Sequence, residues 1–273
     1  MSAMIGCRDL AVGYGGHAVL RDVQLDVRAG QWLAIIGTNG SGKSTLLKTL
    51  AGLLAPISGT SDVRAIGDDR GAPVVSYLSQ SHEQGFLLPI RSRDVVCMGR
   101  WPARGLTGRL RSEDQAMVDE AMDAMGIANL ADQPLGTLSG GQCQRVHLAQ
   151  AMCRHADVLL LDEPTAGLDA ASRERYLQAM DTERSRGTVI ATATHDVREA
   201  QRADVVLVVA GRVVARGAPG EVLTAGVLAE AFGVVISDTT GPVVIDPHHG
   251  HDHHHGPGAP HVHGHAPGHD HDH

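Results

Sequence analysis

A glycine-rich stretch at residues 37–45 carries the residue types that bind phosphate. It reads Gly-Thr-Asn-Gly-Ser-Gly-Lys-Ser-Thr and fits the pattern G-x-x-x-x-G-K-S/T. Backbone N–H groups of such a loop surround the phosphates of a nucleotide. Lys43 would reach the β- and γ-phosphates, and the Ser44 hydroxyl would ligate Mg²⁺. Close approach of the backbone requires residues without a Cβ, which the loop supplies at Gly37, Gly40 and Gly42.

The residues on either side of this loop predict the elements that hold it. The apolar segment 32–36 predicts a buried strand, and residues 45–50 predict a helix. The N-terminus of that helix would add a favourable field for the anion. Lys43 and Lys48 are the two lysines among 23 Lys and Arg residues. In a chain that prefers Arg, a lysine in the loop indicates that a compact point charge is needed there.

Two carboxylates follow an apolar strand predicted at 158–162, about 120 residues after the loop. The strand ends in Asp162, and Glu163 comes next. Asp162 could lie against Mg²⁺, and Glu163 could face the γ-phosphate, where a water must be oriented and deprotonated. A buried strand with a polar end would look the same in isolation. The assignment depends on its pairing with the phosphate loop.

A third motif, Leu-Ser-Gly-Gly-Gln at residues 138–142, precedes a helix predicted from about 141 to 154. Ser139 can cap that helix, and the two glycines, Gly140 and Gly141, would let phosphate oxygens approach the backbone. Taken alone, the pentapeptide could be an ordinary capping turn.

The hydrophobic pattern of the whole chain predicts an α/β architecture. Residues 1–30 alternate, most clearly at 19–27, which predicts exposed antiparallel strands. Further strands are predicted at 74–78, 158–162, 189–194 and 205–209, separated by helical segments, which favours a parallel sheet. The stretch from about 86 to 155 is helical and includes a helix at 112–125 that Ser112 would cap. This block is an insertion into the sheet core.

Together the three motifs resemble those of ATP-binding cassette (ABC) ATPases, and the resemblance covers about residues 3–236. It implies a P-loop NTPase core with an antiparallel β subdomain and an inserted helical subdomain. It also implies hydrolysis of ATP with Mg²⁺. On this resemblance Glu163, His195 and Gln80 are catalytic, and Mg²⁺ is held by Ser44, Gln80 and Asp162. The residues that it implies for nucleotide binding are Tyr14, Gly37, Asn39, Gly40, Gly42, Lys43, Ser44, Thr45, Ser139, Gly140, Gly141, Gln142 and Asp169.

Several of these roles are specific within the resemblance. Tyr14 would stack on adenine, and Gln80 would touch Mg²⁺ and the attacking water and sense the transporter. His195 would contact the γ-phosphate, and the loop 166–169 would cross a dimer interface. Family members form head-to-tail dimers with ATP between the phosphate loop of one subunit and the 139–142 motif of the other. The chain has one copy of each motif, so the resemblance implies a second subunit, a copy of itself or a paralogue.

Charge and composition exclude other classes of protein. The net charge is −8, and after the five acids of residues 237–273 are removed, 26 acids face 23 bases. That balance argues against a nucleic-acid partner, which usually requires a basic face. The four cysteines lack C-x-x-C spacing and indicate reduced thiols. No signal peptide and no apolar run long enough to span a bilayer are predicted, so any membrane role would need a partner.

Two kinds of ABC protein compete, a transporter subunit and a DNA-repair or chromosome-organising ATPase. The second kind carries a long coiled coil, whereas Lys43 and Ser139 are only 96 positions apart here, without heptads. We therefore expect a peripheral subunit on the cytoplasmic face of the membrane. Its partners would be a multi-span permease and, indirectly, an extracytoplasmic metal-binding protein. The segment 94–100 is similar to the transporter-facing region of zinc/manganese and iron-chelate importers.

The tail at residues 237–273 is of low complexity and rich in histidine. Its composition predicts disorder in the absence of metal. Imidazole is a common ligand for Zn²⁺, Ni²⁺ and Cu²⁺, which favours metal binding and zinc import. A purification tag, an inert linker, or a metal buffer attached to an importer of manganese, nickel/cobalt or iron chelates are the alternatives. The candidate zinc ligands are His248, His249, His251, His253, His254, His255, His261, His263, His265, His269, His271 and His273.

Overall fold

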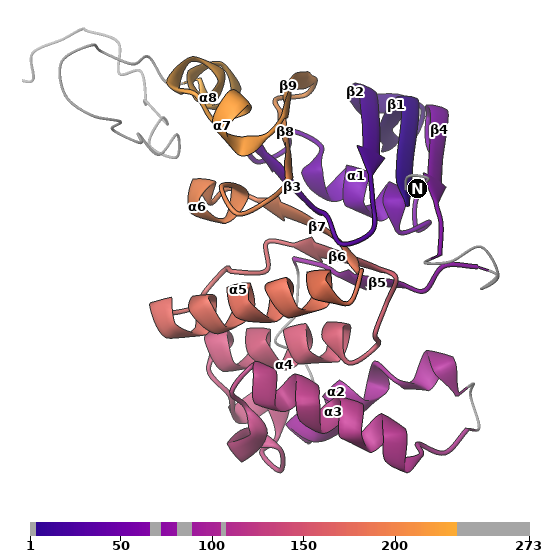
Figure 1. Ribbon diagram of the computed structural model, residues 1–273, viewed down its shortest axis with the longest axis vertical. Coiled ribbons are helices and arrows are strands. Elements are labelled where there is room, and N and C mark those ends of the chain that lie inside the picture. Colours follow the sequence, from indigo (N-terminus) through magenta and orange to yellow (C-terminus); the bar gives the residue numbers. More distant parts are fainter. Residues whose placement is uncertain (1–3, 66–71, 81–88, 105–107, 234–273) are drawn as a thin grey trace, which may run out of the picture.

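A six-stranded sheet forms the centre of the molecule (Figure 1). The computed structural model describes residues 4–65, 72–80, 89–104 and 108–233. The strand order is β5-β6-β7-β3-β8-β9; the first five strands are parallel, and β9 pairs antiparallel at the edge. The strands are β3 (Trp32–Gly37), β5 (Val75–Leu78), β6 (Val158–Asp162), β7 (Val189–Thr194), β8 (Val205–Val209) and β9 (Val213–Gly217). The parallel sheet is thus confirmed, and β9 was not anticipated from the sequence.

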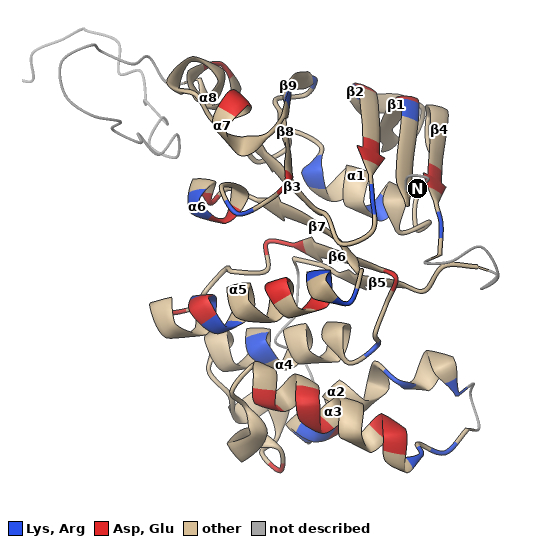
Figure 2. Cartoon of the chain, in the orientation of Figure 1, with Lys and Arg blue, Asp and Glu red and all other residues tan. Residues whose placement is uncertain are grey.

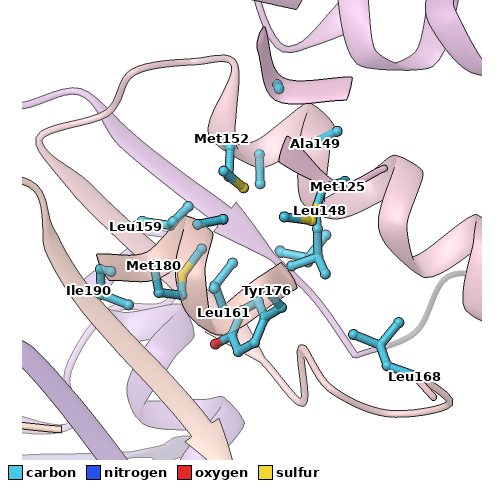
Figure 3. Close-up of a cluster of buried hydrophobic side chains, with 14 of the residues drawn as sticks. Met125, Leu148, Ala149, Met152, Leu159, Leu161, Leu168, Tyr176, Met180 and Ile190 are labelled. Atoms are coloured by element: carbon cyan, nitrogen blue, oxygen red, sulfur yellow. The ribbon is translucent and has the colours of Figure 1, made fainter. Parts of the chain in front are cut away.

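Helices cover both faces of this sheet, which is why its strands are apolar without interruption. Along β6, Leu159 and Leu161 point into one hydrophobic cluster, and Val158 and Leu160 into the other. Figure 3 shows the first cluster, which includes side chains of α4 (Gly140–Met152) and α5 (Ala170–Ser185). The second cluster includes residues of α1 (Lys43–Leu50). Helices α1 and α4 therefore lie on opposite faces of the sheet.

A second, three-stranded antiparallel sheet packs against α1. Its order is β2-β1-β4, formed by β1 (Ile5–Tyr14), β2 (His17–Val27) and β4 (Ser58–Val63). The antiparallel pairing was predicted, but the expectation of exposed strands is wrong for one face. Val23, Leu25 and Val27 are fully buried because alternate side chains of β2 point into the cluster around α1.

The helical block lies at the far edge of the parallel sheet, beside β5 (Figure 1). It consists of α2 (Ser92–Met98), α3 (Ser112–Ala124), α4 and three short 3-10 turns, at Trp101–Ala103, Ala128–Leu130 and Leu135–Thr137. Buried Asp114 joins its parts, accepting hydrogen bonds from Arg100 at 3.0 Å and Arg104 at 2.7 Å. Asp114 also accepts from the backbone N–H of Arg111 at 2.9 Å. Arg111, not the predicted Ser112, is therefore the N-cap residue of α3.

Three short helices also follow β7, in addition to β8 and β9. They are α6 (Val197–Ala200), α7 (Pro219–Val222) and α8 (Ala225–Phe232). No helix within the described ranges is long and apolar enough to cross a membrane. Acidic and basic side chains are interspersed along α5, whereas the charged side chains of α3 are all acidic, as Figure 2 shows. The predicted α/β fold with an antiparallel sheet and a helical subdomain is confirmed, whereas the histidine-rich tail lies outside the described residues.

Candidate functional site

The phosphate loop connects the end of β3 to the start of α1, as predicted. Glycine is required at Gly37 because a Cβ there would lie 2.0 Å from the carbonyl oxygen of Val209. Gly40 and Gly42 have φ values of 78° and 102°, in the left-handed region that favours glycine. A Cβ at Gly42 would also lie 2.8 Å from the Cβ of Leu20. The loop is therefore shaped by its glycines, with Asn39 exposed at its tip and Thr45 buried in α1.

The side chain of Lys43 folds back over the loop. Its Nζ donates hydrogen bonds to the carbonyl oxygens of Gly37 at 2.9 Å and Thr38 at 3.0 Å. Burial lowers the pKa of Lys43, while the nearby charges of Glu163 and Asp162 act in the opposite direction. The ammonium group is thus held between the loop and the two carboxylates at the end of β6, where it can neutralise phosphate.

Asp162 has an environment that fits a divalent cation. The residue is 2% exposed, and its Oδ1 has no hydrogen-bond partner among the described residues. Burial raises the pKa of Asp162, and the adjacent Ser44 hydroxyl and Lys43 charge oppose that rise. A buried carboxylate oxygen without a partner is costly, and a hard cation with oxygen ligands would satisfy it. Ser44 and Asp162 together therefore fit Mg²⁺.

Glu163 and His195 are in direct contact, although they are 32 positions apart. The distance between His195 Nδ1 and Glu163 Oε2 is 2.7 Å. Glu163 has a φ of 52°, a conformation that is unusual for a residue with a side chain, and its backbone N–H donates to Ala193 at 2.9 Å. The bend turns the chain out of β6 at this residue. Glu163 is buried, whereas His195 is exposed, so the pair reaches from the interior to the surface of the protein.

Two predicted residues lie at the margins of this site. Tyr14 is at the end of β1, where its ring is 49% exposed and free to stack on a planar ligand. Burial raises the pKa of Tyr77 to about 12, with smaller contributions from Asp162 and Tyr14, so both of these residues lie near Tyr77. Gln80 is exposed directly after β5 and precedes residues 81–88, which the structure does not describe.

The residues of the third motif are not brought to the phosphate loop. Ser139 is the N-cap of α4, as predicted: its Oγ accepts from the N–H of Gln142 at 3.3 Å, and the Gln142 side chain accepts from the N–H of Ser139 at 2.9 Å. The helix that carries this motif, α4, lies on the face of the sheet opposite α1, the helix that follows the phosphate loop (Figure 1). Gly140 and Gly141 begin the helix, and a Cβ at Gly141 would lie 2.8 Å from the oxygen of Gly167.

The turn at 164–169 joins the third motif to the carboxylate site. Gln144 donates from Nε2 to the carbonyl oxygen of Pro164 at 3.0 Å. Asp169 caps α5 by accepting from the N–H of Ser172 at 2.7 Å, which lowers the pKa of Asp169. The sequence analysis assigned a role to Asp169 but overlooked Gln144, whose place on the inner side of α4 carries no local signal.

A buried glutamate beside the site was also overlooked. Glu199 accepts a hydrogen bond from Tyr176 at 2.8 Å and from Thr165 at 3.3 Å. Burial raises the pKa of Glu199 to about 7. The sequence offers no indication of this environment, because Glu199 stands in a short polar helix that would ordinarily be exposed.

Comparisons with known proteins agree with this geometry. A family model described as ABC transporter matches residues 20–166. The chain is 34% identical over 233 residues to the ferric enterobactin transport ATP-binding protein FepC of Escherichia coli strain K12, covering 82% of this chain and 85% of FepC. It is 36% identical over 237 residues to the zinc transport system ATP-binding protein TroB of Treponema pallidum strain Nichols, covering 86% and 88%.

A solved structure shares the fold. It is described as an inward-facing conformation of a putative metal-chelate type ABC transporter, and it superposes with a TM-score of 0.73 at 26% identity. The match covers 85% of this chain and 90% of that chain. Together with the family match and the relatives, this similarity shows that the chain belongs to the ABC transporter family and is an ATPase of that family.

Proposed function

We propose that this ATPase energises the import of a divalent transition metal, zinc first among the candidates, through a separate membrane permease. The observation that carries the proposal is the tail, whose 27 residues from 247 to 273 contain twelve histidines. It is attached to an ATPase whose relatives include proteins named for zinc and for manganese transport. The subunit would be peripheral, on the cytoplasmic face of the membrane.

In the proposed chemistry Glu163 is the general base and His195 orients it. The 2.7 Å contact between them supports this division, because it fixes one carboxylate oxygen and leaves the other for a water molecule. Lys43 would bind the β- and γ-phosphates, and Tyr14 would stack on the adenine. Ser44, Asp162 and Gln80 would hold Mg²⁺, which when bound neutralises charge on the phosphates.

A complete site in this proposal needs two subunits. The helix that carries the motif at 139–142 lies on the face of the sheet opposite the helix that follows the phosphate loop, which supports a head-to-tail pairing with a second copy. In that pairing the exposed N-terminus of α4, with Ser139, Gly140, Gly141 and Gln142, would meet the γ-phosphate bound by the partner. Asp169, at the start of α5, would lie at the same junction.

The tail would bind several Zn²⁺ ions outside the ATPase site. Imidazoles have a reference pKa near 6.5, so most are neutral and able to ligate at about pH 7.5. Protonation competes with metal, so zinc affinity should collapse towards about pH 5.5. We expect the full chain to bind zinc at the higher pH and the chain ending at residue 246 to bind less. Equal zinc stoichiometry in both would contradict metal binding by the tail.

Transport is tested in cells of the source species that lack this chain. We expect such cells to lose zinc accumulation, measured by elemental mass spectrometry, and to recover it with the intact chain. The Lys43→Ala chain is the matched control, because it keeps the tail and loses the phosphate contact. A deficit in manganese, in nickel/cobalt or in iron supplied as a chelate, with zinc unchanged, would contradict zinc as the substrate.

The second candidate is an importer of another substrate, with the tail acting only as a metal buffer. The similarity to FepC, a ferric enterobactin transport protein, favours this alternative for iron chelates. The two candidates differ in the effect of removing the tail. If the tail is only a buffer, its removal should leave the uptake of the transported metal unchanged. If the tail serves zinc import, its removal should alter how uptake responds to the zinc concentration.

A further inference from the structure

The buried carboxylate of Glu199 connects three segments around the candidate site. Glu199 belongs to the short helix α6 and is 2% exposed. Its carboxylate accepts hydrogen bonds from the Tyr176 hydroxyl at 2.8 Å and from the Thr165 hydroxyl at 3.3 Å, and it also interacts with the Thr194 hydroxyl. One side chain thus holds α5, the turn after Glu163 and the end of β7.

Two of these segments carry the residues proposed for hydrolysis. Thr165 is two positions after Glu163, in the turn that begins with the backbone bend at Glu163. Thr194 is the last residue of β7 and immediately precedes His195. The Thr194 hydroxyl also accepts from the N–H of Asp196 at 3.0 Å, which holds the chain on the other side of His195. The relative position of Glu163 and His195 therefore depends on segments that meet at Glu199.

The third segment supplies a rigid support. The ring of Tyr176 is fully buried in the cluster of Figure 3, with its hydroxyl at the edge of the cluster. Tyr176 lies edge-to-face against Trp32, with ring centroids 6.4 Å apart. Trp32 in turn donates from Nε1 to the Thr192 hydroxyl at 3.0 Å. Since rotation of the Tyr176 ring would disrupt this packing, its hydroxyl is a fixed donor to Glu199.

The carboxyl group of Glu199 is hydrogen-bonded but has no cationic partner in the described part of the chain. Burial raises its pKa to about 7. The ionisable groups that face it are Tyr176 and Asp196, and Asp196 is itself paired with Arg173 at 3.2 Å. An unpaired buried carboxyl group is costly to folding, and such groups concentrate at functional sites.

We propose that Glu199 is a positioning residue for ATP hydrolysis, which holds the Thr165 turn and the Thr194 strand end so that Glu163 and His195 stay in contact. The inference rests on the roles proposed above for Glu163 and His195. Loss of the Glu199 carboxylate should leave the phosphate loop intact, because none of its hydrogen bonds within the described residues involves residues 37–45. It would therefore affect the chemical step and spare nucleotide binding.

The test compares Glu199→Gln with Glu183→Gln in the full-length chain. Glu183 is a matched control, since it is also a buried glutamate with a raised pKa, but it bonds Arg186 and Thr188 away from the site. We expect Glu199→Gln to lower kcat for ATP by roughly 10- to 100-fold, the range typical of a displaced catalytic group. We expect KM for ATP to change by less than about threefold, because the residues that bind ATP before the reaction are unchanged. Glu183→Gln should keep kcat within about twofold of the original chain.

The pH profile separates positioning from a merely structural role. Protonated Glu199 resembles glutamine, so the ratio of the kcat of the original chain to that of Glu199→Gln should shrink as pH falls from 8 to 6. Equal kcat in the Glu199→Gln and Glu183→Gln chains, or a ratio that stays constant over this range, would overturn the proposal.

Two further variants keep the test decisive. Thr165→Val removes one donor and should lower kcat in the original chain but much less in the Glu199→Gln chain, because the two changes break the same contact. Additive effects would contradict a shared contact. Glu163→Gln provides the separate check: normal turnover of that variant would refute the site itself. If Glu163→Gln loses turnover while Glu199→Gln keeps the kcat of the original chain, only the inference about Glu199 is refuted.

Discussion

Replacing Glu163 by glutamine is the sharpest test of the candidate site. The substitution exchanges one carboxylate oxygen for an amide nitrogen and leaves the size of the side chain unchanged. The backbone bond from Glu163 N–H to Ala193 remains, and glutamine can adopt the same φ of 52° at a similar cost. The fold and the phosphate loop should therefore persist, while the proton acceptor is lost.

The expected magnitude follows from the geometry. Glu163 is the carboxylate that His195 contacts at 2.7 Å, whereas Asp162 lies beside Ser44 and is assigned to the cation. Within the described residues, no other carboxylate makes this contact with His195. A positioned general base contributes about 10²- to 10⁴-fold. Loss of Glu163 should therefore slow turnover by about 10²-fold or more, or roughly 3 kcal/mol of activation free energy.

The assay measures phosphate release under saturating MgATP and nucleotide binding by equilibrium titration. We expect unchanged binding, slow release, and an ATP-bound dimer that persists in size-exclusion chromatography. Glu174→Gln is the control, because Glu174 is an exposed glutamate on α5 that contacts only Gln178 within the described residues. Phosphate release by Glu163→Gln at the rate of the control would refute the assignment of the base. Loss of nucleotide binding would refute the separation of binding from chemistry.

Three other perturbations give distinct results. Lys43→Ala should abolish MgATP binding in equilibrium titration, because it removes the cation that Gly37 and Thr38 hold in the loop; normal binding would contradict that role. Asp114→Ala should lower the free energy of unfolding by about 3–5 kcal/mol in denaturant titration, because buried Arg100 loses its carboxylate partner and keeps only the carbonyl oxygens of Cys153 and Arg154. Replacement of the exposed Asp132 by alanine should change the free energy of unfolding little. Equal losses in the Asp114→Ala and Asp132→Ala chains would contradict the argument from burial. Glu199→Gln should change the pH dependence of thermal stability. In the original chain the pKa of Glu199 is about 7 in the folded state and 4.5 in its ordinary range. Ionisation of Glu199 therefore destabilises the folded state as the pH rises from about 4.5 to about 7. The melting temperature of Glu199→Gln relative to the original chain should therefore rise from pH 5 to pH 8, and a constant difference would contradict the raised pKa.

Much of this protein could be predicted from short stretches of sequence. The phosphate loop, the apolar strand ending at Asp162 and the capping box at Ser139 are each encoded within about ten residues, since backbone propensity and capping act locally. The parallel sheet follows from apolar segments that alternate with helices. The edge strand β9 and the Arg111 cap were missed, because weakly apolar strands and non-standard caps have no strong local pattern.

The sequence by itself determined the chemistry that the loop and the two carboxylates can perform, because those residue types and spacings act through contacts made nearby. Tertiary structure alone decided which distant residues meet. It placed His195 against Glu163 and enclosed Glu199 between Tyr176, Thr165 and Thr194. It also placed α4 on the face of the sheet opposite α1. These outcomes depend on how a twisted sheet is covered on both faces, which is a property of long-range packing that no local pattern encodes.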